Sequence, residues 1–197
     1  MFGPLALAFV LDTATPEALQ TPTPFDKVCG RAPSRIADFN AAAATFDLRK
    51  IAAAAQGVVN AYHYCEVDAR EAPQYEEPGI NYLVARQAQY LIVEGRCYGA
   101  LGDVPNALRV LRESDKLAEI VATWQPSSVT LSGRNRDLRP SMYRPAALDI
   151  RAAASYEIQK VLTRRQPGRP PELPAIPEPP PPSAAPQSSV TPAPPRA

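Results

Sequence analysis

The stretch from residue 91 to residue 114, LIVEGRCYGALGDVPNALRVLRES, decides the expected fold. In its first half, apolar residues and glycines recur at helical spacing: Leu91, Ile92, Gly95, Tyr98 and Gly99. This spacing predicts a helix with one apolar face, on which the glycines let a neighbouring backbone approach closely. Gly102 then supplies a stop signal, Asp103 an N-cap, and Pro105 fits the first turn of a second helix.

The second helix of this hairpin carries an apolar stripe along its whole length. The stripe consists of Ala107, Leu108, Leu111, Ser114, Leu117, Ala118, Val121 and Trp124. Charged residues fall mainly off the stripe, so this helix is expected to pack on other parts of the protein.

Several of these residues occupy the positions of the large, close-contact, aromatic, turn and packing residues of a tetratricopeptide repeat. They are Leu91, Gly95, Tyr98, Gly102, Ala107, Leu111 and Ser114. Residues 88–121 therefore resemble about one such repeat. The chain departs from the pattern at Glu94, where an apolar residue is usual, and at Glu119, where a proline usually closes the unit. The resemblance implies an antiparallel pair of helices, of a kind that hosts binding more often than chemistry.

Helical patterns also occur on both sides of the hairpin. Pro33 and Ser34 give a start signal, and apolar residues then follow at spacings of three and four up to Cys65, which predicts one helix through 34–65. Gly57 is a candidate kink in it, and the acidic, proline-bearing segment 71–79 is expected to end it. A further helix is expected from Pro145 to Arg165. The sequence thus predicts an all-α domain over 34–165, either a small bundle or a short tetratricopeptide-like solenoid of about four helices.

The two ends of the chain differ in composition from this domain. Residues 4–11 form an apolar run that matches a signal-peptide core and is shorter than the roughly 20 residues needed to span a bilayer. Residues 1–20 are therefore interpreted as a leader, which indicates a periplasmic or extracellular protein. No basic residue precedes the run, so a frayed or partner-binding terminus of a cytoplasmic protein is the alternative. Residues 21–33 are expected to be extended.

Proline dominates the C-terminal part, because 13 of the 24 prolines follow Gln166. Few large apolar side chains accompany them. Residues 166–197 are therefore predicted to be a polyproline-like, largely disordered tail.

The three cysteines allow several pairings. One helix from Ser34 to Cys65 would separate its ends by about 45 Å, which disfavours a bond between Cys29 and Cys65. Cys65 and Cys97 lie on helices that are expected to be antiparallel and form a candidate disulfide. The alternatives are a Cys29–Cys97 bond or unpaired buried thiols.

No motif in the sequence indicates catalysis, a cofactor or a metal. There is no C-x-x-C pair, no G-x-S-x-G elbow and no glycine-rich phosphate loop. His63 is the only histidine, and on a helix it does not face the same target as Cys65. The acidic pair Glu76 and Glu77 is interpreted as part of a solvated loop. We therefore expect no enzymatic activity and no cofactor.

Charge is nearly balanced overall but unevenly distributed. The formal net charge of +1 argues against a nucleic-acid partner. Residues 131–165 hold eight basic side chains against three acidic ones. Four arginines of this stretch are candidates for docking to an anionic surface, or to the acidic residues 66–77 of a neighbouring copy: Arg134, Arg136, Arg139 and Arg144. A solvated loop is the alternative.

These observations predict a helical scaffold that binds protein partners in a bacterial cell envelope. We expect a groove lined by the helix that begins near Asn81, and five of its side chains are candidate contacts: Tyr82, Arg86, Gln89, Tyr90 and Arg96. The tail would extend toward a second partner. The alternative function is that of a structural accessory subunit, permanently built into a membrane or filament complex.

Overall fold

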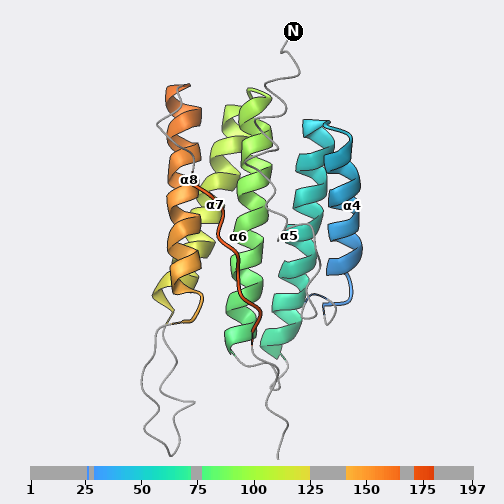
Figure 1. The fold of residues 1–197 in the computed structure, drawn as a ribbon, viewed down its shortest axis with the longest axis vertical. Coiled ribbons are helices and arrows are strands. Elements are labelled where there is room, and N and C mark those ends of the chain that lie inside the picture. The colour runs from blue at the N-terminus through green and yellow to red at the C-terminus, as the bar shows by residue number, and fades with distance from the viewer. Residues whose placement is uncertain (1–25, 27–28, 72–76, 125–140, 165–170, 180–197) are drawn as a thin grey trace, which may run out of the picture.

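A computed structural model describes Asp26 and residues 29–71, 77–124, 141–164 and 171–179. The described part contains five helices: α4 (Ala32–Ala44), α5 (Leu48–Glu71), α6 (Glu77–Ala100), α7 (Val104–Thr123) and α8 (Arg144–Thr163). Figure 1 shows them standing side by side, and each helix packs on the next one along the chain. The predicted all-α bundle is confirmed. No helix in the described ranges combines the length and the apolarity needed to cross a membrane.

The turn between α6 and α7 follows the sequence signals. Gly102 has a φ of +77°, and Asp103 caps α7 by accepting the N–H of Asn106 at 3.3 Å. Gly95 lies against α7, because a Cβ placed on it would come within 2.5 Å of Cγ of Leu111. The close approach predicted at this glycine is therefore confirmed.

The predicted helix over 34–65 is wrong, because the chain turns between α4 and α5. Phe46 adopts a left-handed conformation with a φ of +55°, and the Thr45 hydroxyl donates to the carbonyl of Ala42 at 2.7 Å. Asp47 Oδ1 then accepts the N–H groups of Arg49 at 3.0 Å and Lys50 at 3.2 Å, which caps α5. As a result α4 folds back along α5.

This turn also decides the cysteine pairing. A disulfide joins Cys29, just before α4, to Cys65 of α5, with 5.4 Å between the Cα atoms. The predicted Cys65–Cys97 pair is therefore wrong, and so is the Cys29–Cys97 alternative, because Cys97 is a buried free thiol. An unbroken helix over 34–65 would keep Cys29 and Cys65 apart, whereas the antiparallel return of α4 brings the two residues together.

The core of the bundle is centred on α6. Every residue from 81 to 97 is buried, with α5 and α7 on either side and a further contact to α8. A helix buried on all sides is usually apolar all round. This one also carries several buried polar or charged residues: Asn81, Arg86, Gln87, Gln89, Glu94 and Arg96.

The expected boundaries of the flanking segments are only partly covered. Residues 1–20 lie outside the described residues, so the leader remains a prediction. Ala32 and Pro33, expected in the extended segment, belong to the first turn of α4. Residues 171–179 of the predicted tail are described, and they lie on the bundle.

Candidate functional site

The five α6 side chains that we expected to line an open groove are all buried. None exceeds 5% exposure: Tyr82, Arg86, Gln89, Tyr90 and Arg96. Other parts of the same chain occupy the space around them. The contacts described for them are intramolecular, with residues 171–179 seated on Gln89, so binding of a partner by these side chains stays a prediction.

Asp26 is the partner of two of these residues. Its Oδ1 accepts the hydroxyl of Tyr62 at 2.8 Å and that of Tyr82 at 3.2 Å. Its Oδ2 lies 3.9 Å from Nη2 of Arg86, whose Nε donates to the Tyr62 hydroxyl at 3.2 Å. A buried charge is tolerated when opposite charge and hydrogen bonds compensate it. The cluster thus anchors residue 26 between α5 and α6.

Aromatic rings complete the surroundings of Arg86. Its guanidinium carbon lies 5.7 Å from the ring centroid of Tyr62 and 5.5 Å from that of Tyr90. Burial raises the pKa of Tyr90 to about 12 and the pKa of Tyr62 well above its usual value. Burial lowers the pKa of Arg86, but the tyrosines and Asp26 raise it to a net value above the ordinary one. Arg86 therefore stays charged and both phenols stay neutral near neutral pH.

Two further polar residues of α6 reach its neighbours. The Gln87 amide donates to Oε2 of Glu66 on α5 at 2.7 Å. Arg96 Nε donates to Oε1 of Glu157 on α8 at 2.7 Å, and both side chains of this pair are buried. These bonds fix the positions of α5 and α8 relative to α6.

Glu94 is buried where α6 meets α5 and α7. With its nitrogen toward Glu94, the Gln56 amide donates to Oε2 at 2.9 Å and to Oε1 at 3.2 Å. Burial raises the pKa of Glu94 to about 7, with a lowering effect from Arg109 and a raising effect from Glu113. This carboxyl therefore changes its charge near neutral pH.

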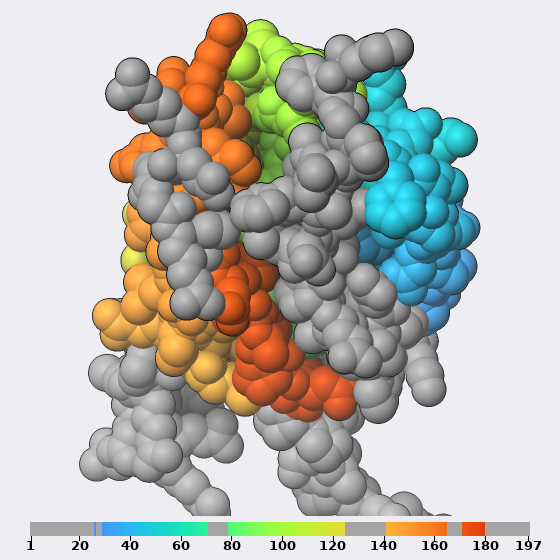
Figure 2. Space-filling model, turned by 45° about the horizontal axis from the view of Figure 1, so that its top comes forward, coloured from blue at the N-terminus to red at the C-terminus, as the bar shows by residue number. Residues whose placement is uncertain are grey.

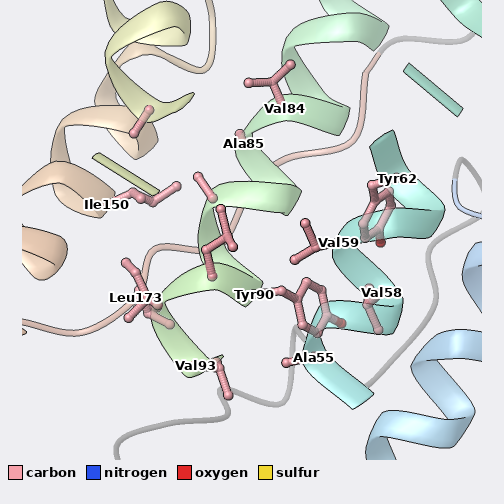
Figure 3. Close-up of a cluster of buried hydrophobic side chains, with 14 of the residues drawn as sticks. Ala55, Val58, Val59, Tyr62, Val84, Ala85, Tyr90, Val93, Ile150 and Leu173 are labelled. Carbon is pink, nitrogen blue, oxygen red and sulfur yellow. The ribbon is translucent and has the colours of Figure 1, made fainter. Parts of the chain in front are cut away.

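The most informative feature for function is the segment 171–179, which lies on the face formed by α6 and α8. Figure 2 shows it in red on the surface beside α8. Leu173 belongs to the hydrophobic core and shares one cluster with Val93 of α6 and Ile150 of α8 (Figure 3). The Gln89 amide donates to the carbonyl oxygen of Pro174 at 2.6 Å. We call this surface the α6–α8 face.

Burial along the segment repeats every third residue. Leu173 and Pro179 are buried and Ile176 is half-buried, whereas 172, 175 and 178 are exposed. The segment is neither helical nor part of a strand. A polyproline II helix has three residues per turn, so every third side chain lies on the same edge. The burial pattern is that of a polyproline II helix lying with one edge on the bundle.

Figure 1 shows the segment running along α6 toward the start of that helix. Pro174 lies at Gln89, in the middle of α6. Burial and, to a smaller extent, the charge of Glu178 raise the pKa of Tyr143, whose ring centroid lies 6.2 Å from that of Tyr82 near the start of α6. The segment therefore runs antiparallel to α6.

Only one of the four candidate arginines can be placed. Arg144 is the first residue of α8 and is exposed. Arg134, Arg136 and Arg139 lie outside the described residues. Docking to an anionic surface therefore stays a prediction.

A second concave surface lies between the start of α4 and α5. It comprises a hollow of about 300 Å³ and an adjoining one of about 490 Å³ that both disulfide cysteines border. Arg31 and Tyr64 line both hollows, with the guanidinium carbon 5.8 Å from the ring centroid. Arg35, on the wall, already pairs with Asp38 at 3.1 Å.

No metal-binding group of three or more His, Cys, Asp or Glu side chains occurs among the residues that the structure describes. His63 is exposed, and its Nδ1 lies 3.9 Å from Oε2 of Glu66. Glu76 and the side chain of Glu77 lie outside the described part. Comparisons with protein-family models, with curated proteins and with solved structures find no match.

Residues 171–179 belong to the stretch 166–197 that is predicted to be a largely disordered tail. The signal that identifies them is the spacing of Leu173 and Ile176, two large apolar side chains three residues apart in a proline-rich stretch. That spacing is the repeat of a polyproline II helix. It indicates an apolar edge, and an apolar edge requires a surface to cover it.

Proposed function

We propose that this protein is a non-enzymatic, helical protein-interaction module, and that the α6–α8 face is the surface on which it binds an extended peptide. The observation that carries the proposal is the seating of residues 171–179 on this face, through Leu173 and the bond from Gln89 to Pro174. A surface that accommodates one extended peptide has the shape and the hydrogen-bond donor to accommodate another. The α6–α7 hairpin is, within this proposal, a unit of tetratricopeptide type.

The proposed location is the cell envelope, outside the cytoplasm. The disulfide between Cys29 and Cys65 supports it, because such bonds form and persist mainly in oxidising compartments. The apolar run over residues 4–11 supports it as a signal-peptide core.

A second candidate function is that of a structural accessory subunit, and α8 favours it. In Figure 1, α8 lies at one end of the row of helices. Its side chains Leu148 and Leu162 are 49% and 59% exposed. Exposed apolar side chains on the outermost helix of a bundle are suited to a permanent contact with another subunit.

Native purification from source cells, with intact mass measurement of the chain and its companions, tests the proposed function. The expected result is a chain that has lost its apolar N-terminal run and carries a protein companion that exchanges on dilution. A companion that remains bound at equal stoichiometry would favour the accessory subunit. A full-length chain that purifies alone, even after chemical cross-linking in the cells, would contradict both functions.

A further inference from the structure

We infer that the partner of the α6–α8 face is a proline-rich segment of another protein, bound as a polyproline II helix with an apolar side chain at every third position. Residues 171–179 are then a built-in competitor that occupies the face until such a partner displaces them. This inference rests on the proposed function, because it names the class of partner that the same face binds.

The register of the seated segment defines the ligand. Leu173, Ile176 and Pro179 place side chains against the bundle at intervals of three residues. A polyproline II helix rises about 3.1 Å per residue, so these contacts lie about 9 Å apart along the face. A helical ligand repeats every three to four residues with a rise of about 1.5 Å, and its side chains would miss the second and third contacts.

The polar contact also suits a proline-rich ligand. Prolines lack the N–H group, but they keep a carbonyl oxygen that makes no internal hydrogen bond in a polyproline II helix. Gln89 provides a buried amide donor for this acceptor, at 2.6 Å from the oxygen of Pro174. The face thus recognises a feature that proline-rich peptides always present.

The same arrangement decides against a second copy as the source of the ligand. Residues 171–179 follow Thr163, the end of α8, in the same chain, separated from it by only seven residues. A short linker gives a tethered ligand an effective concentration of about millimolar. The identical segment of a second copy makes the same contacts without the tether, and at micromolar concentration it loses the competition.

A foreign ligand must therefore bind better than the chain's own segment. Ile176 indicates where this gain arises, because it stays half-buried while Leu173 is only 6% exposed. A ligand that buries its side chain fully at this position gains apolar burial that Ile176 lacks.

The test measures binding of a fluorescent peptide with the sequence of residues 171–179, PELPAIPEP, to full-length proteins by anisotropy. In the variant L173D/I176D the built-in segment is displaced and the face is open. We expect this variant to bind the peptide roughly tenfold or more tightly than the wild type, because the apparent dissociation constant scales inversely with the open fraction. The milder L173A/I176A should bind with an intermediate affinity.

Three controls define what contradicts the inference. Ala175 is exposed in the same segment, so A175D adds a matched charge and should bind the peptide as weakly as the wild type. A peptide with one alanine inserted between its leucine and isoleucine should lose binding, because the insertion rotates the second contact by a third of a turn. Far-UV circular dichroism must show unchanged helix content in each variant.

Equal binding of the peptide by wild type, A175D and L173D/I176D would overturn the built-in competitor. Equal binding of the normal and the inserted peptide would overturn the polyproline II register. A wild-type protein that binds the peptide only as a dimer would reassign the ligand to a second copy. If the peptide fails while companions still purify with the chain, this inference fails and the proposed function stands.

Discussion

Glu94 places a carboxyl group where the surroundings suit an apolar side chain. It is 1% exposed, and burial raises its pKa to about 7. Because this pKa is above the unfolded value of 4.5, the folded protein binds the proton more tightly. The stability that this proton contributes is present at low pH and is lost as the pH rises from about 4.5 through 7. The full loss amounts to about 3 kcal/mol.

The measurement is urea unfolding between pH 5 and pH 8, followed by circular dichroism. E94Q keeps the shape and the hydrogen bond to Gln56 but cannot ionise, so the free energy of unfolding of E94Q should change less over this range. E113Q is the control, because Glu113 is exposed and its removal should leave most of the dependence on pH in place. If the free energy of unfolding depended on pH equally in the wild type and in E94Q, the pKa of Glu94 would be the same in the folded and the unfolded protein.

Single residues also show what the sequence was able to predict. Gly95, Gly102 and Asp103 act through local rules of helix packing and capping, and the structure confirms all three. Arg86 and Gln89 are predicted from the sequence only as residues that line a partner-binding groove. Their actual partners, Asp26 and Pro174, are far away in the sequence and no local rule indicates them.

At the level of the helices, two glycines within helices should respond oppositely to the same substitution. A Cβ on Gly95 of α6 would meet Leu111 at 2.5 Å, so G95A should lower the free energy of unfolding by about 1–3 kcal/mol. A Cβ on Gly57 of α5 would meet nothing closer than 3.7 Å, so G57A should raise it by roughly 0.5–1 kcal/mol. Urea unfolding of both variants tests this prediction, provided that the slope of the free energy of unfolding against urea concentration is unchanged. Destabilisation by both alanines would indicate that α5 has no room for a Cβ at Gly57.

The break between α4 and α5 shows why element boundaries escaped prediction. The apolar spacing continues through Phe46, and the alanines before it favour a helix, so the pattern gave no reason to stop. The available signals were Thr45 and Asp47, which terminate one helix and cap the next. Threonine and aspartate also occur in the interior of helices, so their presence alone does not indicate a helix end. In the structure, the left-handed φ of Phe46 is what distinguishes a helix end from a helix interior here.

At the scale of the whole molecule, the disulfide makes a prediction for thiol labelling. Cys97 is 2% exposed, and burial raises its pKa to about 12, so the native protein should not react with iodoacetamide. Denaturation without a reductant should expose one thiol, and denaturation with a reductant three. Mass spectrometry of the labelled peptides identifies the sites. Labelling of Cys29 or Cys65 before reduction would contradict the pairing.

The loss of the bond should also lower stability. The disulfide closes a loop with a sequence separation of 36 residues. The double variant C29S/C65S should therefore unfold with a free energy lower by about 2–4 kcal/mol. Addition of a reductant should destabilise the wild type to a similar extent and leave the variant unchanged, which separates the bond from the effect of the serines.

The polar side chains of α6 have a consequence for how the chain finds one arrangement among many. Apolar side chains that repeat nearly every turn would let this helix slide by one turn against its neighbours and still bury much of the same surface. Arg86, Gln87, Gln89 and Arg96 each hold a different neighbour: Asp26, Glu66, Pro174 and Glu157. A slide of one turn would break all four bonds together and leave buried polar groups without partners. The apolar side chains of α6 thus favour its packing on the neighbouring helices. These four polar residues fix its position along them.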